Sequence, residues 1–509
     1  MWKQLLFGLL IVLVVIVCTL LVRTFMAQSP HIDPKAGPLH IDGEFGNELK
    51  RFAGGIAIPT VSNRNYEETD FAPFDRFKAY LEKAYPDVYR VMQRDSVNRY
   101  GIVLRWKGSD DSLKPLLFLS HYDVVPSGAG DEATMDTTAV FRTGDTVLPS
   151  PDSVAKEWKY APFSGAVADG RVYGRGTLDM KNMLFSLMEA AEKLLQSGFT
   201  PRRDIYFAFG HDEEVGGLQG AAKIAAYFKS KDLAFEAVYD EGGIVAAAGT
   251  GGISEDVALI GVAEKGKSTL RISVPGAGGH SSMPPKHTAL GDAARIIENL
   301  ENKQMKAVLI TPVQDFLHNV SGGMPFATRL AINNQWLLKP LLVSKLTGSP
   351  VTNAMVRTTT AVTMAKGSDA ANVLPSVAEV TVNFRILPGN TVADVRRHVE
   401  EACEGYNVTI ESLGDAEPTA VSPTDSKGYI RLTQAIARIY PEALITPYLT
   451  MGATDSRKYD ILTRNVYRFM PVLLTPAEQG GIHNNNEFIT VDNYKRMIEF
   501  YYILMKDFD

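Results

Sequence analysis

The sequence predicts an α/β protein with a parallel sheet at its centre, and two observations support this fold class. Short apolar runs typical of buried strands occur at residues 115–120, 205–209 and 236–239. Segments with apolar residues at helical spacing separate these runs. Strands that alternate with helices indicate parallel pairing, because each connecting helix crosses a face of the sheet.

The predicted elements follow in a regular order. A helix in FDRFKAYLEKAY, with Phe74, Phe77 and Leu81 on one face, precedes the strand at 115–120. A second helix, MLFSLMEAAEKLL, leads into the strand DIYFAF, and a third, GAAKIAAYFKS, leads into FEAVYD. Each of these strands ends in polar residues. Open α/β sheets build their sites at that edge.

Composition limits the class of protein. The 509 residues are 45% hydrophobic and 22% charged, enough for two or three domains with proper cores. The net charge is -6 and no dense Lys/Arg cluster occurs, so nucleic acid is not the expected partner. The two cysteines, Cys18 and Cys403, are too few for a disulfide framework.

The N-terminal segment is apolar enough to enter a membrane. Residues 5–22 are almost wholly apolar, longer than a signal-peptide core of roughly 7 to 15 residues, and no A-x-A site follows. We expect an uncleaved anchor, with a cleaved signal peptide and a secreted protein as the alternative. The short tail and large following domain favour a domain outside the membrane, and the sequons at Asn319 and Asn407 are compatible with this. The polar segment 24–40 reads as a tether.

Acidic residues and histidines gather where the predicted strands end. His121 and Asp123 follow the first strand, Glu213 and Glu214 the second, and Asp240 the third. Adjacent glutamates repel each other, so they either face water or have a cation nearby. The matching positions of these residues favour the cation.

Two further residues complete a candidate metal site. Asp179 precedes a helix that starts near Lys181, and His483 follows a distant apolar run. Nitrogen and carboxylate ligands without a thiolate suit catalytic zinc, or two such ions bridged by a carboxylate. From the residues alone, Asp123 could bind metal or orient His121. Asp179 could also be a helix cap, Asp240 a turn residue and His483 a loop histidine.

Seven ordered motifs resemble one family. They are SHYDVVP, GRGTLDMK, GHDEEVGG, DEGG, GGHSSMPP, ANVLPSVAEVTVNFR and GIHNNNE. Together they resemble the di-zinc exopeptidases of the M20 metallopeptidase family, which includes aminoacylase, carboxypeptidase S and succinyl-diaminopimelate desuccinylase. The resemblance runs from about residue 40 to the C-terminus. Within the family, the N-terminal anchor and the form of the DEGG motif make this sequence most similar to carboxypeptidase S and the secreted N-fatty-acyl-amino acid hydrolases.

The resemblance implies two zinc ions per chain. One zinc would be held by His121 and Asp240 and the other by Glu214 and His483, while Asp179 would bridge the two ions.

The resemblance also implies roles for the neighbouring residues. Asp123 would orient His121, and Glu213 would be the general base that activates a water between the zinc ions. A cis peptide bond is expected between Asp179 and Met180.

The middle of the chain predicts a second domain. Strands at STLRISVPG, RTTTAVTMAKG, AEVTVNFRIL and NVTIESL, with helices at ALGDAARIIENLEN and VADVRRHVEEAC, match the ferredoxin-like α+β lid of the family. The implied fold is a zinc-exopeptidase-like mixed sheet flanked by helices, with this lid inserted. The implied division is a membrane anchor 1–23, a tether 24–40, a catalytic domain 41–265 and 413–509, and a lid and dimerisation domain 266–412.

The lid carries three further candidates. By resemblance, His280 would stabilise the oxyanion and, in dimeric relatives, reach the site of the partner subunit, which implies a homodimer through the lid. Arg385 and Asn372 would bind the terminal carboxylate of the substrate. As alternatives, His280 is a turn residue and Arg385 an exposed strand residue.

Two segments depart from the family pattern. Residues 129–155 form a polar insertion that could line a cleft or decorate the surface. Residues 305–355 add an apolar segment that could form an acyl pocket, a dimer surface or ordinary core.

The sequence therefore predicts a membrane-anchored zinc hydrolase of a peptide or N-acyl amide bond next to a free carboxylate. One alternative is a small-molecule deacylase of the acetylornithine or succinyl-diaminopimelate type. An inactive module that binds peptides or amino acids is the alternative of another class.

Overall fold

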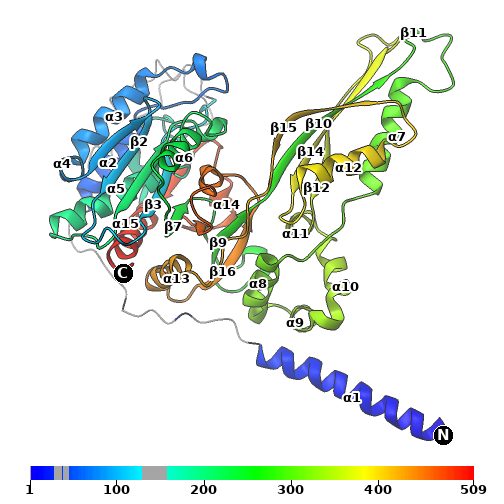
Figure 1. The fold of residues 1–509 in the computed structure, drawn as a ribbon, viewed down its shortest axis with the longest axis horizontal. Coiled ribbons are helices and arrows are strands. Elements are labelled where there is room, and N and C mark those ends of the chain that lie inside the picture. Colours follow the sequence, from blue (N-terminus) through cyan, green and yellow to red (C-terminus); the bar gives the residue numbers. More distant parts are fainter. Residues whose placement is uncertain (1, 28–31, 33–36, 38–44, 129–157) are drawn as a thin grey trace. The chain divides into compact units, whose positions relative to one another are not determined.

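The chain divides into two compact units. A computed structural model describes residues 2–27, 32, 37, 45–128 and 158–509 (Figure 1). The large unit comprises Pro30–Val262, Ser422–Thr446 and Thr454–Asp509. The small unit comprises Met1–Ser29, Ala263–Val421 and Pro447–Ala453. The predicted insertion at 129–155 and most of the predicted tether lie outside the described residues.

The main sheet is mixed, and among the described residues it has ten strands. Its centre is parallel, with β3 between β6 and β7, while β1 and β2 add antiparallel strands at one edge. The expected mixed α/β fold is therefore confirmed. In spatial order the strands are β1 (Gln93–Val97), β2 (Gly101–Trp106), β6 (Ile205–Gly210), β3 (Leu116–His121), β7 (Ala237–Asp240), β17 (Val466–Arg468), β9 (Val257–Glu264), β8 (Val245–Ala246) and β18 (Leu473–Leu474), with β16 (Leu444–Thr450) paired to β9.

Helices cover both faces of this sheet (Figure 1). Successive strand residues point to opposite faces, so Leu116 and Phe118 enter one core and Leu117 and Leu119 another. Strands buried on both faces explain the continuous apolar runs in the sequence. The helices of the large unit are α2 (Gly46–Ile56), α3 (Ala72–Ala84), α4 (Pro86–Val91), α5 (Lys181–Gln196), α6 (Ala221–Ser230), α13 (Lys427–Ile439), α14 (Pro476–Gln479) and α15 (Val491–Lys506).

A small second sheet in the large unit joins distant parts of the chain. Its strands are β19 (Phe488–Thr490), β5 (Arg171–Tyr173) and β4 (Ala166–Ala168). Through the pairing of β19 with β5, the segment after His483 lies beside the segment before Asp179.

The small unit contains an antiparallel sheet with helices on one face. The sheet order is β12 (Thr359–Lys366), β14 (Val377–Ile386), β10 (Gly266–Pro275) and β15 (Thr409–Ala416), and α7 (Ala289–Asn302) and α12 (Val392–Ala402) pack against it. This is the ferredoxin-like arrangement that the resemblance implied. A two-stranded ribbon, β11 (Gly279–His280) and β13 (Val373–Leu374), is separate from this sheet.

The apolar segment 305–355 is helical. It forms α8 (Thr311–Val320), α9 (Phe326–Asn333), α10 (Gln335–Leu346) and α11 (Pro350–Val356). Its inward side chains, such as Val313, Leu317 and Leu342, form a hydrophobic cluster together with Ala263, Leu387 and Leu449. Part of the segment is therefore ordinary core. Its outward side chains remain exposed, as described below.

The N-terminal segment forms one continuous helix, α1 (Trp2–Met26). Among the described residues it is the helix long and apolar enough to cross a membrane, a description that a signal sequence also meets. The predicted apolar N-terminal helix is thus present in the structure.

Candidate metal centre

The site begins where three parallel strands end side by side. In β3, His121 pairs with Gly210 of β6, and the other neighbour of β3 is β7. The carboxyl ends of the three strands therefore lie at one edge of the sheet, as the sequence predicted. Short segments after these ends carry Asp123, the two adjacent glutamates and Glu241.

The four polar residues after β6 divide into two pairs. His211 turns into an aromatic pocket, where its Nε2 lies 3.1 Å from the hydroxyl of Tyr66. Asp212 accepts hydrogen bonds from the backbone N–H groups of Gln219 and Gly220, both at 2.7 Å. The 3-10 turn Glu213–Val215 then presents both glutamates to the metal cluster.

A tight approach follows this turn. Gly217 has a φ of 66°, and a Cβ there would lie 2.0 Å from Oδ1 of Asp455. Only glycine fits such a backbone at such a contact.

Asp179 and His483 come from loops that are joined by a buried ion pair. Arg175 Nη1 lies 2.7 Å from Glu487 Oε2. The other oxygen of Glu487 accepts the backbone N–H groups of Leu178 and Asp179, at 2.7 and 3.2 Å. The motifs GRGTLDMK and GIHNNNE are thus fixed to one another. The expected cis peptide bond between Asp179 and Met180 is present.

Asp179 lies between the two histidines. Its Oδ1 is 3.2 Å from Nε2 of His121, and its Oδ2 is 2.9 Å from Nε2 of His483. Glu214 Oε2 lies 3.1 Å from the same nitrogen of His483. Glu241 Oε1 lies 3.4 Å from Nε2 of His121. The cluster therefore has two ends that share one aspartate.

The structure places Glu241, rather than the predicted Asp240, in this cluster. Asp240 is the last residue of β7 and its Oδ2 accepts the backbone N–H of Ser456 at 2.8 Å. Neighbouring residues at a strand end point in opposite directions, so one acid of the DEGG motif can face His121. The sequence held this signal, since the motif offers two adjacent carboxylates.

Asp123 holds the cluster together from behind. One of its oxygens lies 3.3 Å from Nδ1 of His121 and accepts the N–H of Glu213 at 3.1 Å. The other accepts the Ser62 hydroxyl at 2.7 Å and the N–H of Glu214 at 3.2 Å. Asp123 thus orients the histidine and both glutamates. Of the two roles that the sequence allowed, metal ligand or orienting residue, these contacts fit the orienting role.

Both histidines carry strongly raised pKa values. Burial alone would lower the pKa of His121, but the carboxylates of Asp123, Asp179 and Glu241 raise it well above its ordinary value. Hydrogen bonds to Asp179 and Glu214 raise the pKa of His483 to about 10. The carboxylates therefore stabilise the protonated, positively charged form of both imidazoles.

The three glutamates of the cluster also have raised pKa values, whereas hydrogen bonds to the histidines outweigh burial and lower the pKa values of Asp123 and Asp179. Burial, and after it the nearby charges of Glu241 and Asp455, raise the pKa of Glu213 well above its ordinary value. Burial and the charge of Asp179 raise the pKa of Glu241 to about 8. Without a cation, the cluster is neutralised by protons that bound metal would replace.

The geometry fits a transition-metal ion. Two groups of three residues each have ligand atoms that all lie within 4.8 Å of one another. One group is His121, Asp179 and Glu214, and the other is His121, Glu213 and Glu241. A tetrahedral ion with ligands at about 2.1 Å holds them about 3.4 Å apart, close to the separations given above. Moreover, the buried Oε1 of Glu214 has no hydrogen-bond partner among the described residues.

The remaining predicted residues lie in the small unit. His280 of β11 is exposed and pairs with Val373 of β13, next to Asn372, whose carbonyl accepts the N–H of Ser281 at 3.1 Å. Arg385 is an exposed residue of β14, opposite Lys267 and Thr359. His280 and Asn372 are therefore neighbours on one ribbon, whereas Arg385 belongs to the four-stranded sheet.

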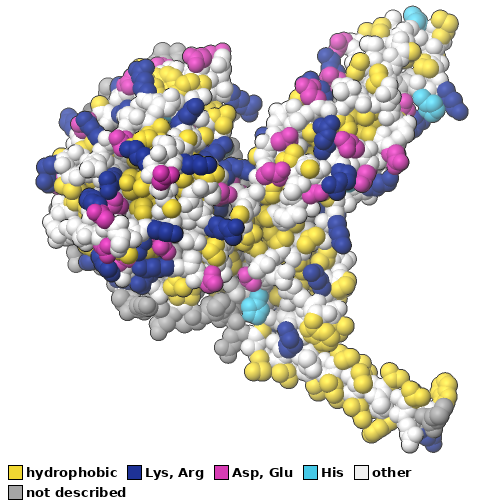
Figure 2. Space-filling view, viewed as in Figure 1, with side chains coloured by type: hydrophobic (Ala, Val, Ile, Leu, Met, Phe, Trp, Pro, Cys, Tyr) yellow, Lys and Arg dark blue, Asp and Glu magenta, His cyan; other side chains and the backbone are white. Residues whose placement is uncertain are grey.

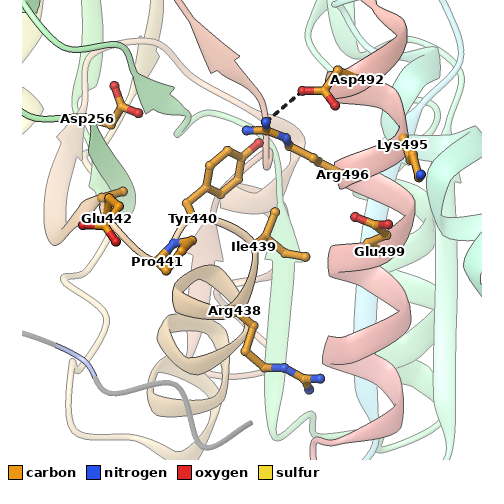
Figure 3. Close-up of a pocket in the computed structure, with 11 residues that line it drawn as sticks. Asp256, Arg438, Ile439, Tyr440, Pro441, Glu442, Asp492, Lys495, Arg496 and Glu499 are labelled. Atoms are coloured by element: carbon orange, nitrogen blue, oxygen red, sulfur yellow. Dashed lines mark ion pairs between the residues drawn. The ribbon is translucent and has the colours of Figure 1, made fainter. Parts of the chain in front are cut away.

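A cavity of the large unit lies apart from the metal cluster. It measures about 420 Å³, and its lining includes Asp256, Arg438, Tyr440 and Arg496 (Figure 3). Arg496 pairs with Asp492 at 2.8 Å and lies over the Tyr440 ring, so its charge is already compensated. None of the predicted site residues lines this cavity.

Comparisons with known proteins agree with this geometry. A sequence profile described as Peptidase family M20/M25/M40 matches residues 144–507. Probable carboxypeptidase S-like 2 of Dictyostelium discoideum is 34% identical, over 99% of this chain and 93% of that protein. An N-fatty-acyl-amino acid synthase/hydrolase of Homo sapiens is also 34% identical, over 98% of this chain and 97% of that protein.

A solved structure supports the fold. An M20 family metallo-carboxypeptidase from Sulfolobus solfataricus matches with a TM-score of 0.61 and 18% identity, over 91% of this chain and 99% of that chain.

Proposed function

Because the chain belongs to peptidase family M20/M25/M40 and is therefore a hydrolase, we propose that it cleaves a peptide or N-acyl amide bond next to a free carboxylate. The observation that carries this proposal is the position of Glu213. Its half-buried side chain lies within a cluster of histidines and carboxylates with the separations that metal ligands require.

We propose two zinc ions as the cofactor. Asp179 would bridge them, with His121 and Glu241 at one ion and Glu214 and His483 at the other. This assignment replaces Asp240 of the sequence prediction by Glu241. When bound, the ions polarise the amide carbonyl and make water more acidic.

Glu213 would act as the proton carrier. A carboxylate whose pKa is raised takes a proton from water more readily than an ordinary glutamate does. The protonated Glu213 then donates to the nitrogen of the leaving amine, so the base is restored within one turnover. Asp123 supports this role because its Oδ1 accepts a hydrogen bond from the backbone N–H of Glu213 at 3.1 Å and so holds that residue in position.

The small unit would supply substrate recognition. Arg385 and Asn372 would bind the free carboxylate, and His280 the oxyanion, as the family resemblance implies. An exposed planar guanidinium suits a bidentate contact with a carboxylate. A homodimer through the small unit, which the resemblance also implied, stays a prediction.

We further propose that α1 anchors the enzyme in a membrane, with the catalytic unit on the far side from the N-terminal tail. The length and apolar composition of α1 support this, while cleavage would release a secreted enzyme.

The test uses the full-length protein with its metal content measured on the same preparation. Blocked dipeptides, long-chain N-acyl amino acids and N-acetylornithine are offered to the wild type, to Glu213→Gln and to the exposed control Glu82→Gln. We expect about two zinc ions per chain and hydrolysis of one of the first two classes. Turnover should fall by at least about a thousandfold in Glu213→Gln and remain unchanged in the control.

Other outcomes would select the alternatives. Turnover of N-acetylornithine alone would favour the small-molecule deacylase. Metal-loaded protein that binds the substrates without turnover would favour the inactive binding module. Full activity of Glu213→Gln would refute the mechanism.

A further inference from the structure

The end of α1 packs against the rest of the small unit through specific polar contacts. Asn334, which is fully buried, donates from Nδ2 to the carbonyl of Leu20 at 3.1 Å and to the hydroxyl of Thr24 at 3.0 Å. Arg23 Nε donates to the carbonyl of Asn333 at 3.3 Å. Phe25 also contacts Phe326, with ring centroids 5.9 Å apart. The junction between α1 and α9 is therefore a defined contact.

This contact lies near the C-terminal end of the apolar part of α1. Leu20 belongs to the apolar run 5–22, and a helix rises about 1.5 Å per residue, so the contact lies about 3 Å from the end of that run. If α1 spans a bilayer, the run fills its hydrocarbon core. The junction of α9 and α10, where Asn334 contacts Leu20, then lies at the membrane interface.

The helices at this position expose large apolar side chains. Phe326 is 50% exposed, Trp336 56% and Leu341 64%, with Leu337 beside them on α10. Figure 2 shows hydrophobic side chains on this part of the small unit next to those of α1. Tryptophan is enriched at membrane–water interfaces, and Trp336 lies on the same helix as Lys339 and Lys345.

The charge of α9 and α10 has one sign. These helices contain Arg329, Lys339 and Lys345 and no Asp or Glu, although the whole chain has more acids than bases and Asp315 of α8 lies near Trp336. Carboxylates near lipid headgroups are unfavourable, whereas lysine and arginine extend their charges toward the phosphates.

We infer that α9 and α10 lie on the surface of the phospholipid bilayer that α1 crosses. The inference depends on the proposed anchoring and is independent of the hydrolytic chemistry. The small unit is then held against the lipid by α9 and α10. The enzyme is attached to the membrane twice, by the spanning helix α1 and by the α9–α10 surface.

Depth-dependent quenching tests the inference on the full-length chain. An environment-sensitive dye is attached to a single introduced cysteine in a Cys18→Ser background, where the buried Cys403 remains. The labelled positions are Leu341→Cys on α10, Val12→Cys inside α1, and the control Met283→Cys, an 80% exposed position of the small unit after β11. The protein is reconstituted into phosphatidylcholine vesicles with brominated acyl chains, with and without phosphatidylserine.

We expect bromolipid to quench the dye at positions 12 and 341 by at least about twofold, and at position 283 much less. Stronger quenching at 341 with phosphatidylserine would assign part of the contact to the lysines. Quenching at 12 but not at 341 would overturn the inference and leave the anchor intact. Quenching at neither position would overturn both. Energy transfer between 341 labels on different chains, without quenching, would assign the surface to a second copy instead.

Discussion

The carboxylate of Asp123 accepts a hydrogen bond from the backbone N–H of Glu213, with Oδ1 and N 3.1 Å apart. Its other oxygen accepts the N–H of Glu214 at 3.2 Å, while Oδ1 also faces His121. A base and two proposed ligands thus depend on one carboxylate that needs no contact with metal. Residues of this kind tune metal affinity and activity from behind the ligands.

Asp123→Asn should therefore lower zinc affinity and kcat by about 10- to 100-fold. The amide would set an NH2 group against an N–H donor, because both carboxylate oxygens accept backbone N–H groups. Zinc affinity by competition with a chelator and kcat are the measurements. Asp204→Asn is the control, since Asp204 also accepts a backbone N–H but lies outside the cluster. Equal losses in both variants would reduce Asp123 to a folding role.

Glu241 and Asp240 should respond differently to the same substitution. Glu241→Ala should reduce the zinc content from about two ions to about one and abolish most activity, because one ion loses a ligand. Asp240→Ala should keep its metal and lose about 1–3 kcal/mol of folding free energy, because the buried N–H of Ser456 loses a charged acceptor. Metal analysis and denaturant unfolding separate the two. Loss of metal in Asp240→Ala alone would restore the sequence assignment.

Much of this architecture was predictable from local patterns. The alternation of buried strands and helices predicted the parallel centre of the sheet, and it placed His121 and the two glutamates at neighbouring strand ends. The period of Phe74, Phe77 and Leu81 likewise predicted α3, where all three are buried. These features are set by hydrophobic periodicity, which a single sequence displays.

Other features depend on contacts between distant residues. Whether Asp240 or Glu241 faces His121 depends on the residue at which β7 ends, a difference of one position that the apolar pattern does not resolve. The ion pair of Arg175 and Glu487 joins residues more than 300 positions apart. In the sequence alone, neither residue can be distinguished from a charged residue on the surface. Such features follow from three-dimensional packing.

The metal-free protein should lose stability as pH rises. Hydrogen bonds to Asp179 and Glu214 raise the folded-state pKa of His483 from 6.5 to about 10. The folded state therefore holds the proton more tightly, and this stabilisation is complete below about pH 6.5 and lost as pH rises through 10. Thermal unfolding of chelator-treated protein between these pH values is the measurement.

His483→Gln isolates this effect. The difference in Tm between wild type and variant should shrink toward pH 10 in the metal-free protein, since the variant has no imidazole to protonate. With zinc bound, the dependence should change sign, because metal binding requires the neutral imidazole and is favoured by higher pH. A difference in Tm that is constant from pH 6.5 to 10 without metal would contradict the assigned proton.

Glu487→Gln should weaken both the fold and the metal site. The substitution leaves the buried Arg175 without its countercharge, which costs about 3–5 kcal/mol, and it loosens the loop whose N–H groups at Leu178 and Asp179 bind Glu487. Glu189→Gln is the matched control, because Glu189 is equally buried and pairs with Arg51 away from the cluster. Both variants should lose stability in denaturant unfolding, and Glu487→Gln alone should also lose zinc affinity. A loss of zinc affinity in both would mean that the metal site responds to global stability, and that Glu487 does not position Asp179.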